Sequence, residues 1–179
     1  MKTQTKNLKT FLWLLTLIMT LTFFSCEKDP LEDCRKDPTC EYFTCKVNGV
    51  RWEPQCKGEP FFGGCTPWDV LYGGGIKAMD MHIDNEAKNS RITMIIRKEW
   101  LKIGNNQLYT DDFIQTFYAD GGEICNIFVL DTISPHSFNI LQIDTIKYYL
   151  KGTFNFKGNN DCGDQVTITD GEFNLPYRS

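Results

Sequence analysis

The sequence has little of what metal sites and most hydrolases require. Only two of its 179 residues are histidines, His82 and His136. No C-x2-C pair occurs, although close cysteine pairs hold most structural zinc ions. No G-x-S-x-G motif occurs either, so the usual nucleophile of an α/β-hydrolase is absent. We therefore expect no cofactor and no metal site, and the sequence offers no catalytic residues.

A surplus of positive charge is also missing. The chain has 19 basic and 23 acidic side chains, and Lys2, Lys6 and Lys9 precede the first acidic residue, Glu27. Residues 26–179 therefore carry 16 basic against 23 acidic side chains, a net charge of −7. This balance argues against nucleic acid as a partner, because phosphate contacts need a basic surface. It argues equally against electrostatic binding to anionic lipid.

No apolar run is long enough for a membrane span of about 20 residues. The apolar stretch 11–24 is diluted by three threonines and follows a basic segment, which is the layout of a secretory signal peptide. Ser25 and Cys26 close it. A small residue followed by cysteine at this point resembles the lipobox of bacterial lipoproteins, in the relaxed form with bulky residues found in Bacteroidota, since Phe23 and Phe24 precede it.

The resemblance implies cleavage between Ser25 and Cys26 and acylation of the Cys26 thiol. Stable anchoring takes about two acyl chains such as palmitate, or one chain and a second signal. The membrane is then a partner through these chains, and the early acidic residues resemble surface-export signals of Bacteroidota lipoproteins. We expect a lipid-anchored protein of the outer membrane or cell surface. An ordinary secretory signal and an uncleaved anchor are the alternatives.

The expected organisation is a lipoprotein signal peptide (1–25), a tether (26–40) and a single all-β domain (41–179). The tether contains two prolines and alternating charges, which favours an extended linker. The chain has eight cysteines. An exported chain meets oxidising conditions, so those not acylated are candidate disulfide cysteines: Cys34, Cys40, Cys45, Cys56, Cys65, Cys125 and Cys162. Seven is odd, so at least one thiol is free or pairs outside the chain. Zinc binding by the cluster 34–65 is the alternative.

Alternating and β-branched segments dominate the domain. Asn48-Gly49 between apolar residues predicts a hairpin, whereas 61–75 is too rich in glycine and proline for regular structure. Further strands are expected at 76–84, 91–97, 100–103, 113–119, 124–130, 137–144, 146–158 and 165–177. No long helical pattern occurs. We predict an antiparallel β-sandwich or partly closed barrel of about 8–10 strands, with a disulfide-bearing N-terminal segment.

Both ends of this domain carry a recurring pattern. The first end reads FTCKVNGVRWEP, and the second contains Gly152-Thr153-Phe154 with Phe156, followed by Thr169-Asp170-Gly171 with Phe173. Together they resemble a β-rich domain of unknown function found in uncharacterised Bacteroidota lipoproteins, over residues 41–177. The resemblance implies the lipoprotein setting and no activity. From the residues themselves, we expect Trp52 and the three phenylalanines in the core, and Gly152 and Gly171 at bulges or close backbone approaches.

Other polar groups have structural interpretations. The segment SPHS, with His136 and Ser137, is expected to be a turn before a strand. GNNDCGD, which could offer calcium four oxygen ligands, is expected to be a tight hairpin loop. Paired carboxylates of a glycosidase are defined by their separation in space, and the unassigned candidates are Asp80, Asp84, Asp111, Asp112 and Glu123.

Aromatic side chains offer the best binding hypothesis, because sugars stack on aromatic faces. The candidate ligand-binding residues are Trp68, Tyr72 and Trp100, and Trp68 lies in a loop-like segment. We predict a non-enzymatic binding or envelope-interaction module whose partner is a glycan or an envelope protein. A small carbohydrate-active or peptide hydrolase, and a structural subunit of an envelope complex, are the alternatives.

Overall fold

The computed structural model describes residues 29, 31–57, 66–72, 78–97, 101–111, 114–122 and 124–178. The chain divides into two compact units, residues 1–36 and 37–179. The predicted all-β class is confirmed, since the protein is an antiparallel half-barrel sheet with 4% helix. Cys26, Cys65 and Trp100 lie outside the described residues. Within the described residues, no helix is long and apolar enough to cross a membrane.

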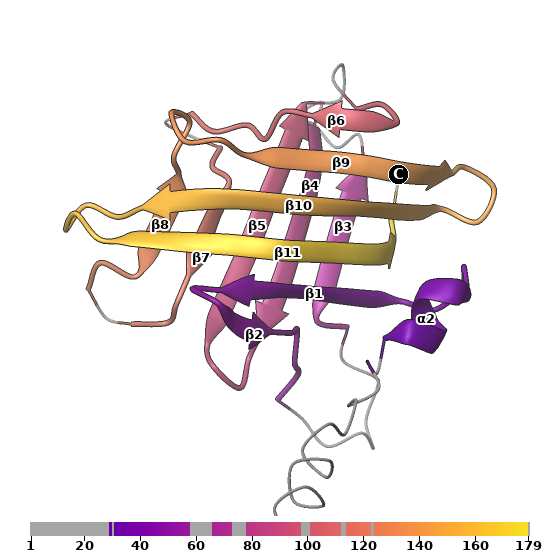
Figure 1. Ribbon diagram of the computed structural model, residues 1–179, viewed down its shortest axis with the longest axis horizontal. Helices are drawn as coiled ribbons and strands as arrows, with labels where there is room; N and C mark the ends of the chain where they lie inside the picture. Colours follow the sequence, from indigo (N-terminus) through magenta and orange to yellow (C-terminus); the bar gives the residue numbers. More distant parts are fainter. Residues whose placement is uncertain are drawn as a thin grey trace, which may run out of the picture. The chain divides into compact units, whose positions relative to one another are not determined.

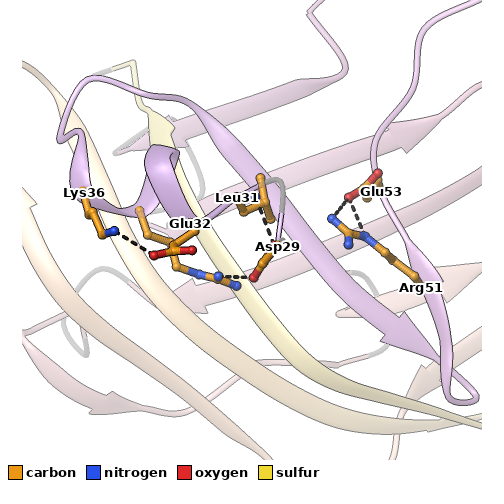
Figure 2. A network of polar contacts seen from close by, with 7 residues as sticks. Asp29, Leu31, Glu32, Lys36, Arg51 and Glu53 are labelled. Carbon is orange, nitrogen blue, oxygen red and sulfur yellow. Dashed lines mark hydrogen bonds and ion pairs between the residues drawn. The ribbon is translucent and has the colours of Figure 1, made fainter. Parts of the chain in front are cut away.

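The first unit contains one short helix, α2 (Glu32–Lys36). Its first turn is acidic and its last turn basic, which matches the helix dipole. Figure 2 shows the Asp29 carboxylate accepting a hydrogen bond from Leu31 N at 3.0 Å and Lys36 Nζ bonded to Glu32 at 2.8 Å. The tether was expected to be extended, and this is wrong for residues 32–36, where the charge pairing supports a helical turn.

The second unit holds all eleven described strands. Their bounds are β1 (Tyr42–Val47), β2 (Val50–Trp52), β3 (Trp68–Tyr72), β4 (Ala78–Asn85), β5 (Ser90–Arg97), β6 (Gly104–Asn106), β7 (Phe117–Ala119), β8 (Ile127–Leu130), β9 (Ser137–Asp144), β10 (Tyr149–Asn159) and β11 (Gln165–Pro176).

The sheet branches at β10, which pairs with β11, β8 and β9. Its main path runs β2-β1-β11-β10-β8-β7-β5-β4-β3. Beside this path, β9 pairs with the first half of β10, and β6 pairs with β9. Figure 1 shows the layer of β9, β10, β11 and β1 crossing in front of β3, β4 and β5. Short strands β7 and β8 join the two layers, because β8 pairs with the last residues of β10 and β7 pairs with β5.

The core fills the space between these layers. On β4, Met79, Met81 and Ile83 are buried while the residues between them are half-buried, as a period of two requires. The predicted core residues are confirmed: each is at most 2% exposed, and they are Trp52, Phe154, Phe156 and Phe173. Trp52 also donates its indole N–H to Ser90 Oγ at 2.9 Å, so its one polar atom is satisfied.

Local sequence signals placed several elements correctly. Asn48 and Gly49 both have positive φ, 50° and 81°, and they join β1 to β2 as the predicted hairpin. Gly152 and Gly171 each lie against the ring of a core phenylalanine, and a β-bulge interrupts the β10–β11 register between Phe154 and Phe156. The expectation of close approaches and bulges is therefore confirmed.

Two local predictions were wrong. Residues 68–72 were expected to be irregular, yet they form β3, because WDVLY alternates and its backbone pairs with β4. Residues 101–103 were expected in a strand and are not; the neighbouring Gly104–Asn106 forms β6 by pairing with β9.

Cysteine usage also departs from the prediction at one position. Cys125 is bonded to Cys162. Cys34, Cys40 and Cys56 are each disulfide-bonded, which confirms the predicted disulfide-bearing N-terminal segment. Zinc binding by Cys34, Cys40 and Cys56 is contradicted, because their sulfurs are bonded to other cysteines. Cys45 was a candidate disulfide cysteine, but it is free. Its side chain is buried in the hydrophobic core beside Trp52 in the β1–β2 register, which makes it the predicted odd thiol.

Candidate functional site

A pocket of about 420 Å³ lies where β3 meets the C-terminal segment of the chain. It is lined by Thr66, Trp68, Asp69, Val70, Pro176 and Arg178. Its volume lies within the range of about 300–1,000 Å³ that is usual for ligand pockets. We call it the corner pocket.

The C-terminal segment forms one wall of the corner pocket. Tyr72 N donates to Arg178 O at 2.6 Å, and Arg178 N donates to Val70 O at 2.9 Å, which creates an isolated parallel bridge between Leu71 and Arg178. This bridge covers the edge of β3 over three residues only. Among the described residues this pairing does not extend to Trp68, and both Trp68 and Pro176 line the pocket.

Trp68, which lines the pocket, has one unusual buried atom. Its Nε1 is buried and has no hydrogen-bond partner among the described residues. A buried indole N–H usually finds an acceptor, and leaving a buried donor unpaired costs about 1–3 kcal/mol. Because Nε1 is buried, a ligand in the corner pocket would meet the rest of the half-buried Trp68 side chain and not this atom.

Three tyrosines contact one another where β3 meets the C-terminal segment, and none of them is among the residues that line the pocket. The ring of Tyr177 contacts those of Tyr72 and Tyr148, each at 5.7 Å between centroids in edge-to-face geometry. Tyr72 packs against the core, whereas Tyr148 is 50% exposed and has a φ of 60°. Two of the three predicted aromatic candidates, Trp68 and Tyr72, therefore lie on one strand at this corner. Tyr148, Tyr177 and Arg178 were not predicted, because only the tertiary fold brings them there.

Polar side chains cover the outer face of the neighbouring strands. Asp69, His82 and Thr93 lie side by side on β3, β4 and β5, and Asp84 lies opposite Arg91 in the next row. The pairs are tight: Arg178 Nη2 lies 2.6 Å from Asp69 Oδ1, and Arg91 Nε lies 2.6 Å from Asp84 Oδ1.

His82 stands between a carboxylate and a hydroxyl. Its Nε2 lies 3.0 Å from Asp80 Oδ2, and its Nδ1 lies 3.1 Å from Thr93 Oγ1. The hydrogen bond to Asp80 raises the pKa of His82 above its usual value, and burial opposes this rise. Asp80 Oδ1 is buried with no partner among the described residues, which favours a positive charge on the imidazole.

This acid–histidine–hydroxyl arrangement has the order of a hydrolase triad, but it lacks an accessible nucleophile. Thr93 is only 1% exposed, so no substrate carbonyl could reach its hydroxyl. The sequence contained a usable signal, since Asp80 and His82 are two residues apart on an alternating strand and therefore share a face. The hydrogen bond to Thr93 depends on the β4–β5 register.

A second hollow, of about 490 Å³, lies on the same face beyond Arg91. Paired side chains and amides dominate its lining: Lys57, Asp84, Asn85, Glu86, Asn89, Ser90, Arg91, Phe117, Ala119, Gly121 and Asn126. Glu86 accepts a hydrogen bond from Lys57 N at 2.6 Å. We call this hollow the polar groove.

The other predicted polar segments have structural roles. His136 Nδ1 lies 3.2 Å from the Ser134 carbonyl oxygen, and β9 begins at Ser137, as expected of a turn before a strand. Asn160 Oδ1 accepts from Cys162 N at 3.1 Å and Asp164 N at 2.8 Å, so the loop expected as a tight turn is confirmed. Among the unassigned carboxylates, Asp111 accepts from Ile114 N at 2.7 Å. Asp112 and Glu123 lie outside the described residues.

Comparisons of the chain with protein-family models, with curated proteins and with solved structures found no match.

Proposed function

We propose that the protein is a cell-envelope lipoprotein whose β-domain binds a saccharide in the corner pocket without catalysing a reaction. The observation that carries the proposal is a pocket of about 420 Å³ whose lining combines the half-buried ring of Trp68 with the paired side chains of Asp69 and Arg178. Sugar hydroxyls can hydrogen-bond to that pair. Their C–H faces can pack on the aromatic rings, whose negative faces attract the weakly positive hydrogens.

The membrane setting rests on the lipobox-like segment ending at Ser25 and Cys26. Acyl chains on Cys26 would hold the domain at the outer membrane or cell surface, where it would meet glycans or envelope proteins. Intact mass of the protein from its native membrane tests this part. A mass equal to residues 26–179 plus diacylglyceryl and acyl groups supports it, and an unlipidated mass contradicts it.

Saccharide binding is tested with the full mature domain and a panel of soluble polysaccharides, read out by titration calorimetry. Trp68→Leu removes the aromatic ring from the pocket lining, so we expect it to weaken binding about tenfold, which corresponds to about 1.4 kcal/mol. Trp52→Leu is the matched control, because it makes the same change inside the core. It should lower stability and leave affinity unchanged. Equal affinities of wild type and Trp68→Leu would contradict the proposal.

A further inference from the structure

Three acid–base pairs connect the corner pocket to the polar groove. They are Asp69 with Arg178, Asp80 with His82, and Asp84 with Arg91, at 2.6, 3.0 and 2.6 Å. The outer row of Asp69, His82, Thr93 and Phe117 crosses four strands. Three strand spacings span about 14 Å.

Thr93 is buried in this row, whereas the charged side chains along it are accessible to solvent. Both arginine side chains are at least half exposed, and the His82 side chain is 36% exposed. Over His82 and Arg91, a ligand meets the face of the sheet and not its edge. Backbone pairing by strand addition is therefore unavailable to it, and side chains must provide the recognition.

Each pair presents a hydrogen-bond donor next to an acceptor, and its charges cancel. The polar groove continues this pattern, since its lining contains two basic and two acidic side chains together with the amides of Asn89 and Asn126. A charged ligand would be attracted and repelled in equal measure along such a surface. Hydroxyl groups both donate and accept, so vicinal hydroxyls match it.

The floor of the polar groove is built closely. Gly121 has a φ of 76°, and a Cβ there would lie 2.2 Å from Asn89 O, so only glycine lets these two loops meet. The bidentate pairing of Arg91 with Asp84 fixes the guanidinium plane at the entrance, through Nε at 2.6 Å and Nη2 at 3.3 Å. Phe117 adds an apolar ring to the lining.

We propose that the corner pocket, the three pairs and the polar groove form one track that binds a linear, uncharged oligosaccharide of several units. This inference rests on the proposed saccharide-binding function. One sugar would occupy the corner pocket beside Asp69 and Arg178, and later units would lie over His82 and reach Arg91. One sugar unit is shorter than the row, so only longer chains can contact all of it. Affinity should therefore grow with chain length.

The test uses neutral glucan, xylan and mannan oligosaccharides of one to six units, with a uronic-acid hexamer and a serine–glycine hexapeptide as comparison ligands. We expect a neutral hexasaccharide to bind at least tenfold more tightly than its disaccharide. Arg91→Gln should weaken hexasaccharide binding about tenfold and leave disaccharide affinity unchanged. Arg91→Lys, which keeps the charge but loses the bidentate geometry, is the second variant if Arg91→Gln is unstable.

Lys46→Gln is the matched control. Lys46 is 51% exposed and paired with Asp170 at 2.9 Å, whereas Arg91 is 50% exposed and paired on the opposite layer. Length-independent affinity, or equal effects of the Arg91 and Lys46 variants, would overturn the track while leaving the corner pocket intact. Preference for the charged hexamer or the peptide would also overturn it. Failure of every saccharide to bind would refute the proposed function itself.

Discussion

Gly171 lies opposite Phe154 in the β10–β11 pair, and a Cβ atom on Gly171 would come within 2.6 Å of three carbons of the Phe154 ring. The glycine therefore leaves room for the phenylalanine at the centre of the core. Phe154 in turn contacts the rings of Phe43 and Phe173, at 5.1 and 6.3 Å between centroids. The two glycine–phenylalanine motifs near the C-terminus act as one packing unit.

Gly171→Ala should lower the free energy of unfolding by about 2–3 kcal/mol, because the new methyl group overpacks the core. Urea denaturation of the purified domain measures this loss. Gly163→Ala is the control: a methyl group on Gly163 would meet no atom within 4 Å, but the residue has a φ of 89°, so only backbone strain of about 1 kcal/mol is expected. A Gly171→Ala protein as stable as wild type would contradict the packing explanation.

Cys45 should resist alkylation in the folded protein. Burial raises the pKa of its thiol to about 12, so the reactive thiolate is scarce at pH 8 and the core shields the sulfur. In the absence of reductant, iodoacetamide should label Cys45 in the unfolded protein and not in the folded protein. Peptide mass analysis measures this labelling. The Cys45→Ala variant identifies the labelled position. Labelling of Cys45 at native pH 8 would show that the thiol is exposed.

The Cys125–Cys162 disulfide joins two loops 37 residues apart in sequence. Replacing both residues by serine should lower the free energy of unfolding by about 3–4 kcal/mol, from the chain entropy regained by the unfolded state. Urea denaturation without reductant compares the double variant with wild type. An unchanged midpoint would mean that the loops are held together by other contacts, such as the bond from Asn160 Nδ2 to Cys125 O at 2.7 Å.

Stability should fall modestly as the pH rises above about 6.5 because of His82. Asp80 on β4 and Asp69 on β3 raise its pKa, while burial and Arg91 on β5 lower it, and the net pKa is above the usual 6.5. The stabilisation is therefore complete below about pH 6.5 and is lost as the pH rises through the higher folded-state pKa. Solvent screening limits it to under about 1 kcal/mol. His82→Gln should remove this pH-dependent part of the free energy of unfolding. A His82→Gln variant whose stability varies with pH as in the wild type would contradict the prediction.

The strands that local pattern predicts well are those whose side chains alternate between core and solvent. Residues 137–144 match β9 at both ends, and the Ser90–Arg97 strand contains the predicted 91–97. β3 was missed because glycine and proline flank WDVLY and hid its alternation. β6 consists of Gly104, Asn105 and Asn106, which have low strand propensity, and it exists only through its pairing with β9.

The candidate site was predictable in part for the same reason. Trp68 and Tyr72 could be named from residue type and context. The wall of the corner pocket could not, because Arg178 reaches β3 through a bridge between residues more than 100 positions apart. Likewise, the polar row depends on the registers of β3, β4 and β5, which no single segment encodes.

The most direct test of saccharide binding at Trp68 is the indole N–H resonance in a ¹H–¹⁵N spectrum. The ligand is the tightest binder from the saccharide panel, and the Trp52 indole, already bonded to Ser90, serves as an internal control. If a sugar packs on the Trp68 side chain, the Trp68 indole proton resonance shifts on titration while that of Trp52 stays in place. A Trp68 resonance that does not move at saturating ligand would contradict the account.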